Sequence, residues 1–177
     1  MRVPSAVHAV LLLASASLLP ACGDRVGGVR YPGAGAGRIV VERQSGGRLL
    51  NVAARATYCR QDSLLVVYAL DGRWSAGLTV RGPFPVRATR TFAVRPVLAG
   101  DGTAAAAFRA VDDSVHPAVM ALRGTVQIDA GPRVTGRFEI GAAPEKGSSI
   151  PIHLVGAFRS LPTSDTAATC GTLPRTP

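Results

Sequence analysis

The last third of the chain alternates between apolar and polar positions. In residues 122–128 and 134–140 the even positions are apolar or glycine, and the odd positions are polar or charged. Residues 152–158 again carry apolar side chains or glycine at the even positions. A period of two gives a strand one buried and one solvated face, which is typical of antiparallel sheets. We therefore expect three antiparallel strands in this part of the chain.

Each of these three predicted strands carries one glycine on its apolar face. The glycines are Gly124, Gly136 and Gly156. Glycine inside a strand often marks a bend, a bulge or a close approach of another backbone. We expect one of these features at each position.

Further apolar runs predict strands in the preceding part of the chain. They cover residues 39–42, 49–59, 64–70, 74–81, 86–94 and 104–111. Asp71-Gly72 is a strong signal for a tight hairpin turn between two of the runs. Run 104–111 favours a helix by propensity, but its neighbours favour a strand. Because no segment has convincing helical periodicity, we expect an all-β domain. It would be a single antiparallel β-sandwich, or a partly closed barrel, of about eight or nine strands.

The N-terminal segment has a different pattern. Arg2 is followed by an almost wholly apolar stretch over residues 7–19, which has the length of a signal-peptide core. The stretch is too short to span a bilayer comfortably, since spanning takes about 20 apolar residues. An alternative, a buried N-terminal helix, fits less well with Pro20 and the glycine-rich stretch that follows.

Residues 19–22 read LPAC, which resembles the lipobox of bacterial lipoprotein precursors. The resemblance implies that residues 1–21 are removed and that Cys22 becomes the lipid-bearing N-terminus. Two or more acyl chains anchor a protein stably, whereas one myristoyl chain does so only marginally. Gly23 stands where an aspartate commonly retains lipoproteins in the inner membrane, so the resemblance implies the outer membrane in a cell with two membranes.

The chain from Cys22 onward is expected to consist of two parts, a tether and a domain. Residues 22–37 are rich in glycine and lack periodicity, so we expect a flexible tether. Residues 38–177 form the predicted β-sandwich domain. The GAGAG run at residues 33–37 follows no buried strand and precedes no helix, so it is not predicted to bind phosphate. Residues 119–170 also loosely resemble the sandwich domains of bacterial envelope lipoproteins.

With Cys22 assigned to the lipid, two cysteines remain, Cys59 and Cys170. An even pair in an exported protein predicts a disulfide. Neither cysteine has the CxxC spacing or the nearby histidine that zinc sites usually have. In the chain-entropy model, a disulfide that closes a loop of about 110 residues contributes roughly 4–5 kcal/mol of stability, often less in practice.

The chain is basic, with a formal net charge of +9. Residues 1–21 contain Arg2 and no acidic residue, so their removal lowers the net charge to +8. Such an excess fits an anionic partner such as lipid headgroups or a polysaccharide. It also fits a GC-rich genome, which we favour because the arginines are dispersed and Lys146 is the only lysine. The export signal argues against nucleic acid as a partner.

No group of residues predicts an enzyme, a metal site or a cofactor. Asp112, Asp113 and His116 lie close in sequence, but a polar loop with a turn-forming pair of aspartates explains them more simply. No serine lies in a Gly-x-Ser-x-Gly elbow. Trp74 is a candidate platform for a sugar ring or a partner, although burial at the edge of the core is commoner.

We therefore expect an exported, lipid-anchored envelope protein whose domain has a non-catalytic structural or interaction role. Its partners would be the membrane, through the lipid, and an envelope protein or polysaccharide. The alternative is a binding module for an anionic or carbohydrate ligand. The sequence leaves the oligomeric state open.

Overall fold

The described part of the chain consists of strands and connecting segments. The computed structural model describes residues 25–26, 28–71, 74–110, 119–144 and 152–166, and contains no helix among them. The strands are β1 (Arg25–Val26), β2 (Val29–Arg30), β3 (Arg38–Arg43), β4 (Arg48–Cys59), β5 (Leu64–Asp71), β6 (Trp74–Arg81), β7 (Arg90–Val94), β8 (Thr103–Ala110), β9 (Val119–Ile128), β10 (Val134–Pro144), β11 (Ile152–Leu161) and β12 (Thr163–Thr166).

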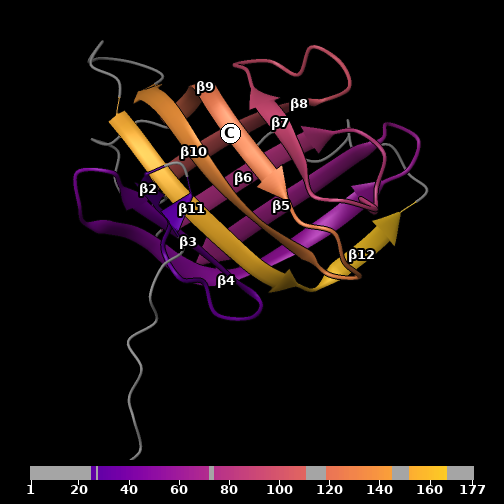
Figure 1. Cartoon of the computed structure of the whole chain (residues 1–177), viewed down its shortest axis with the longest axis horizontal. Helices are drawn as coiled ribbons and strands as arrows, with labels where there is room; N and C mark the ends of the chain where they lie inside the picture. Colours follow the sequence, from indigo (N-terminus) through magenta and orange to yellow (C-terminus); the bar gives the residue numbers. More distant parts are fainter. Residues whose placement is uncertain (1–24, 27, 72–73, 111–118, 145–151, 167–177) are drawn as a thin grey trace, which may run out of the picture.

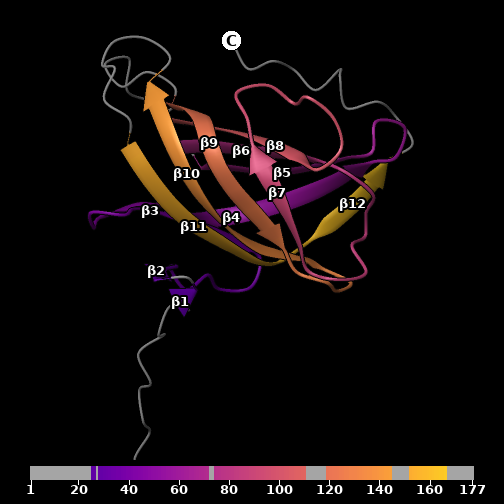
Figure 2. The ribbon, with the colours of Figure 1, turned by 45° about the horizontal axis from the view of Figure 1, so that its top comes forward.

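Strands β3 to β11 close into a barrel (Figures 1 and 2). Around the ring the order is β4-β3-β11-β10-β9-β7-β8-β6-β5, and β5 pairs back with β4. All pairings in the ring are antiparallel except the short one between β7 and β8. β12 adds to β4 as an extra parallel strand, and β1 and β2 form a separate two-stranded sheet. The all-β prediction is confirmed.

Apolar and polar residues alternate in the last third of the chain because its strands form the wall of the barrel, with one face inside and the other in solvent. Over residues 124–128 of β9 and 134–140 of β10 the even-numbered residues face the interior, where Val126, Ile128, Phe138 and Ile140 are at most 2% exposed. Leu122, predicted on the apolar face, is instead 43% exposed and Ala121 is buried, because the pairing of β9 with β10 shifts register between Gly141 and Ala142. The odd-numbered neighbours face outward. The other strands contribute valine, leucine and alanine to the same interior cluster. The barrel therefore encloses a packed hydrophobic core.

Two of the glycines give room to phenylalanine rings on the neighbouring strand. Gly136 of β10 pairs with Phe158 of β11, and Phe138 of β10 pairs with Gly156 of β11. A Cβ on Gly156 would lie 2.1 Å from Cζ of Phe138, and one on Gly136 would lie 2.7 Å from Cζ of Phe158. The rings thus occupy the volume that side chains would need at the two glycines.

Gly124 of β9 has a different reason to be glycine. Its φ is +137°, and a Cβ there would lie 2.1 Å from the carbonyl oxygen of Glu139 on β10. The pairing of the two strands also shifts register between Gly141 and Ala142. A close approach of another backbone is therefore confirmed at Gly124, and also at Gly136, where a Cβ would lie 2.3 Å from the carbonyl oxygen of Gln127. At Gly156 the close atoms belong to the side chain of Phe138, so that prediction is not confirmed there.

The region between β6 and β8 departs most from the predicted strands. The predicted strand 86–94 is observed only at Arg90–Val94. The preceding residues belong to the connection from β6, where Pro83 and Pro85 lack the N–H group that a strand ladder needs. The alanine-rich run forms β8 rather than a helix, and Ala104 and Ala106 point into the core.

Residues 31–37, which we call the strap, lie against the barrel. Tyr31 is 9% exposed, and Pro32 is also buried. The amide of Gly37 donates to the carbonyl of Arg159 on β11 at 2.8 Å. The sequence predicts a flexible tether over residues 22–37, whereas the structure places its last seven residues on the outer face of the barrel.

Candidate binding sites

The structure brings few of the sequence-predicted site residues together. Cys22, Cys170 and the residues Asp112, Asp113 and His116 lie outside the described part of the chain. Trp74 is the first residue of β6, and its side chain is not described.

Cys59 is the last residue of β4 and is completely buried. β12 runs parallel to β4, and Thr166 at the end of β12 pairs with Cys59. Cys170 follows only four positions later in the sequence. The fold thus places Thr166, the last described residue, beside Cys59, and the disulfide stays a prediction.

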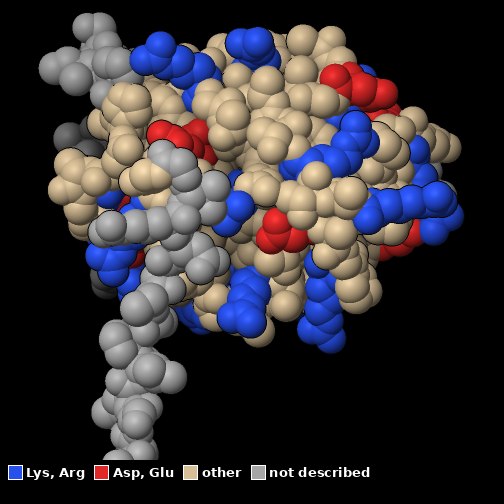
Figure 3. All heavy atoms as spheres, viewed as in Figure 1, with Lys and Arg blue, Asp and Glu red and all other residues tan. Residues whose placement is uncertain are grey.

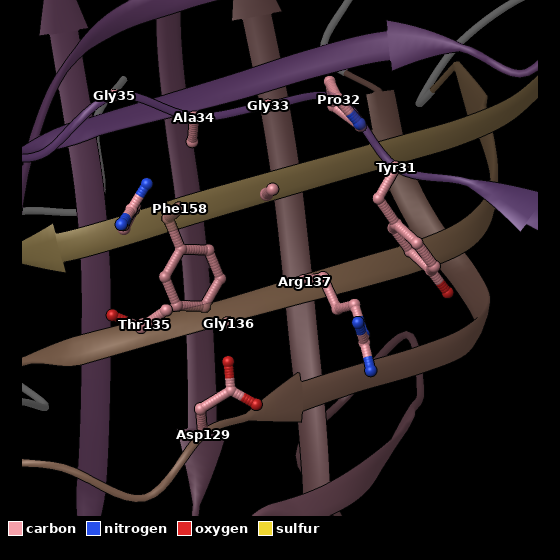
Figure 4. Close-up of a pocket in the computed structure, with 12 residues that line it drawn as sticks. Tyr31, Pro32, Gly33, Ala34, Gly35, Asp129, Thr135, Gly136, Arg137 and Phe158 are labelled. Carbon is pink, nitrogen blue, oxygen red and sulfur yellow. The ribbon is translucent and has the colours of Figure 1, made fainter. Parts of the chain in front are cut away.

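The strap and the outer face of β10 and β11 enclose a groove of about 600 Å³, which we call the strap groove (Figure 4). Residues 31–35 form one wall. Thr135, Arg137 and Arg159 are among the residues of the opposite wall, and Asp129 lies at the end of the groove. Figure 4 shows Tyr31 and Arg137 side by side at one end of the groove.

Arg137 ties the strap to the barrel. Its guanidinium lies 5.3 Å from the centre of the Tyr31 ring, and its Nε donates to Oε1 of Gln127 at 2.8 Å. Burial raises the pKa of Tyr31 above 10.0, Glu139 adds to the increase, and Arg137 opposes it. Within the described residues, no partner is found for the terminal nitrogens of Arg137 or for the side chain of Arg159. These nitrogens are the groups of the groove that can bind an anion.

A second hollow lies at the end of the barrel, between the connections β6–β7 and β9–β10 and the strands β4, β5 and β12, and we call it the end pocket. Its volume is about 180 Å³. Leu65 and Ile128 of the barrel interior lie at its base. Tyr58 and Phe84 form an aromatic wall, with their rings edge-to-face and their centres 5.8 Å apart. Phe84 also stacks on Phe92 of the core at 5.9 Å.

Charged residues surround the mouth of the end pocket. Nε of Arg60 donates to both carboxylate oxygens of Asp165, at 2.9 and 2.8 Å. This hydrogen bonding lowers the pKa of Asp165 below 3.8. Asp129 and Arg133 also line the pocket. Trp74 begins β6 and so lies at the opposite end of that strand from the pocket, which adjoins the β6–β7 connection.

Sequence analysis missed both hollows. Tyr31 is the only aromatic residue in the glycine-rich stretch after Cys22, and this is the one sequence feature that distinguishes the strap from a plain linker. The end pocket has no such signal, because its residues come from strands and connections far apart in the sequence. No group of three or more potential metal ligands occurs among the described residues.

The described residues also include no helix with the length and apolar character needed to span a bilayer. No protein-family model matches the chain, and no curated protein or solved structure matches it.

Proposed function

We propose that the chain is a lipid-anchored protein of the bacterial envelope whose barrel is a non-catalytic interaction domain. The strap is the observation that carries the proposal. It joins the segment after the lipobox to the outer face of a barrel whose interior is filled with apolar side chains. An anchored domain of this kind presents its outer surface, rather than an internal site, to partners.

The short connection supports this arrangement. Eight residues separate Cys22 from Tyr31, the first buried residue of the strap. The nine steps from Cys22 to Tyr31 reach at most about 30 Å in an extended chain, and the β1–β2 hairpin between the two residues shortens the reach. A lipid on Cys22 would therefore hold the barrel close to the membrane surface.

The charges on the surface fit an interaction domain better than a general polyanion binder. Figure 3 shows arginine side chains scattered singly over one face, with acidic side chains between them. A surface built to attract polyanions through long-range fields usually gathers one sign of charge.

The anchor is tested by metabolic labelling with a radioactive fatty acid and by fractionation of the envelope. We expect label on the wild-type protein and sedimentation with membranes. Cys22→Ser should lose both, whereas Cys170→Ser, which also removes one cysteine, should keep both. A Cys22→Ser protein that still sediments with membranes would contradict the lipid anchor.

The strap groove favours a second candidate function, the binding of an anionic envelope ligand. Arg137 and Arg159 both line the groove, and two guanidinium groups suit a carboxylate or phosphate group. We expect Arg137→Gln and Arg159→Gln to weaken binding of a sulfated polysaccharide such as heparin, measured by calorimetry at low salt. Arg55→Gln, which changes an exposed arginine on β4 outside the groove, is the matched control. Equal effects of the three substitutions would reject this candidate.

A further inference from the structure

The end pocket has the size of one apolar ring. Its volume of about 180 Å³ is below the roughly 300–1,000 Å³ typical of pockets for drug-sized ligands. An apolar cavity of roughly 150 Å³ is known to take up one benzene molecule. The pocket therefore suits a single six-membered ring.

The walls of the pocket suit an aromatic ring in particular. Tyr58 and Phe84 form one side, and Pro132 of the β9–β10 connection and Val134 at the start of β10 contribute apolar groups as well. Aromatic rings favour edge-to-face or offset contacts with one another. Because Phe84 also stacks on Phe92 and Leu65 is only 1% exposed, the inner part of the pocket is formed by the core.

The mouth of the pocket offers one positive and one negative group. Asp165 is already bound by Arg60. Asp129 and Arg133 line the same pocket, and within the described residues neither side chain forms a hydrogen bond or an ion pair. In particular, the two side chains do not pair with each other, so both charges are available to a ligand.

We propose that the end pocket binds a free α-amino acid with an aromatic side chain. The ring lies between the aromatic wall and Val134, the carboxylate meets Arg133, and the ammonium group meets Asp129. An aromatic acid without an amine would bring its carboxylate near Asp129 without compensation. An aromatic amine without a carboxylate would bring its positive charge near Arg133, again without compensation. A zwitterionic amino acid pairs its carboxylate with Arg133 and its ammonium group with Asp129.

The test is calorimetric titration of the purified full chain with L-phenylalanine. For a ligand of this size, ordinary ligand efficiency corresponds to a Kd of about 1 mM or lower. 3-Phenylpropionate lacks the ammonium group, phenethylamine lacks the carboxylate, and alanine lacks the ring. We expect each analogue to bind about 10-fold more weakly or worse, because each loses one charged hydrogen bond or the apolar contact.

Three substitutions locate the site. Arg133→Gln and Asp129→Asn should each weaken L-phenylalanine by about 10-fold or more. Both positions are at the surface or only partly buried, so the fold should tolerate the changes. Arg87→Gln, in the neighbouring β6–β7 connection but outside the pocket, should leave the Kd unchanged. The proposal is overturned if no saturable heat appears up to about ten times the expected Kd. It is also overturned if the three analogues bind as well as L-phenylalanine, or if the two pocket substitutions have no more effect than Arg87→Gln.

Discussion

Replacement of Gly156 by alanine tests whether the barrel depends on the pairing of glycine with phenylalanine. The new Cβ would lie 2.1 Å from Cζ of Phe138 and 2.5 Å from its Cε1. Carbon atoms pack best at about 3.5–4.0 Å, so the ring or the strand must move by more than about 1 Å. Neither moves freely, because Phe138 is 2% exposed and stacks on Phe108 in the core.

The expected cost follows from these contacts. Forcing extra volume into a packed core costs about 1–3 kcal/mol. Replacing glycine with alanine returns about 0.4–1 kcal/mol, because it reduces the freedom of the unfolded chain. We therefore expect a net loss of about 1–2 kcal/mol. For a domain of this size, that loss lowers Tm by about 2–8 °C.

The assay is thermal and urea unfolding followed by circular dichroism. Gly77→Ala is the matched control, because a Cβ at Gly77 on β6 meets nothing within 4 Å. Its stability should be unchanged or should rise by up to about 1 kcal/mol. Trimming the ring in a Gly156→Ala/Phe138→Leu double variant should restore part of the loss, giving a coupling energy of about 1 kcal/mol. If Gly156→Ala is as stable as Gly77→Ala, the steric argument is refuted.

Three further predictions concern the strap, the end pocket and the cysteines. The raised pKa of Tyr31 means that the fold favours the neutral phenol. Strap docking should therefore be complete below pH 10.0 and weaken as the pH rises through the folded pKa. Proteolysis of the strap should report this change, and Tyr31→Phe should remove the pH dependence. The lowered pKa of Asp165 means that its contribution to stability is present above pH 3.8 and is lost as the pH falls through the folded pKa. Arg60→Gln should raise the pKa of Asp165 back toward 3.8, as measured by NMR of the carboxyl group. If the substitution left the pKa of Asp165 unchanged, the ion pair with Arg60 would be rejected. If Cys59 and Cys170 form a disulfide, thiol counting on the folded, unreduced protein should find neither of them free, and reduction should lower Tm.

The strands were predictable from the sequence where one face of the sheet is buried and the other is solvated. Over residues 124–128 of β9 and 134–140 of β10 this contrast places apolar and polar residues in strict alternation, so these parts of the strands follow from periodicity alone. The reason for glycine at Gly124 was also predictable, since few other causes put glycine at a buried strand position.

The closure of the sheet was not predictable in the same way. It depends on β4, whose last six residues pair with β5 while β3 and β12 share its other side. Such long-range partners leave no periodic trace in the chain. The strap escaped prediction for a related reason, because its glycines suggest a linker and only Tyr31 contributes much buried surface. The end pocket requires two connections and the strands β4, β5 and β12 to meet, which only the folded chain reveals.

The closed ring also bears on aggregation. An open sheet exposes a row of unpaired backbone groups, which invites pairing with another chain. Within the described residues, the first half of β4 pairs only with β3, and another open edge of the ten-stranded sheet lies at β12. That edge is four residues long and reads TSDT, and its first three residues are exposed and polar. Short and charged edges resist edge-to-edge pairing, so β12 should not act as a template for a strand of a second copy of the chain.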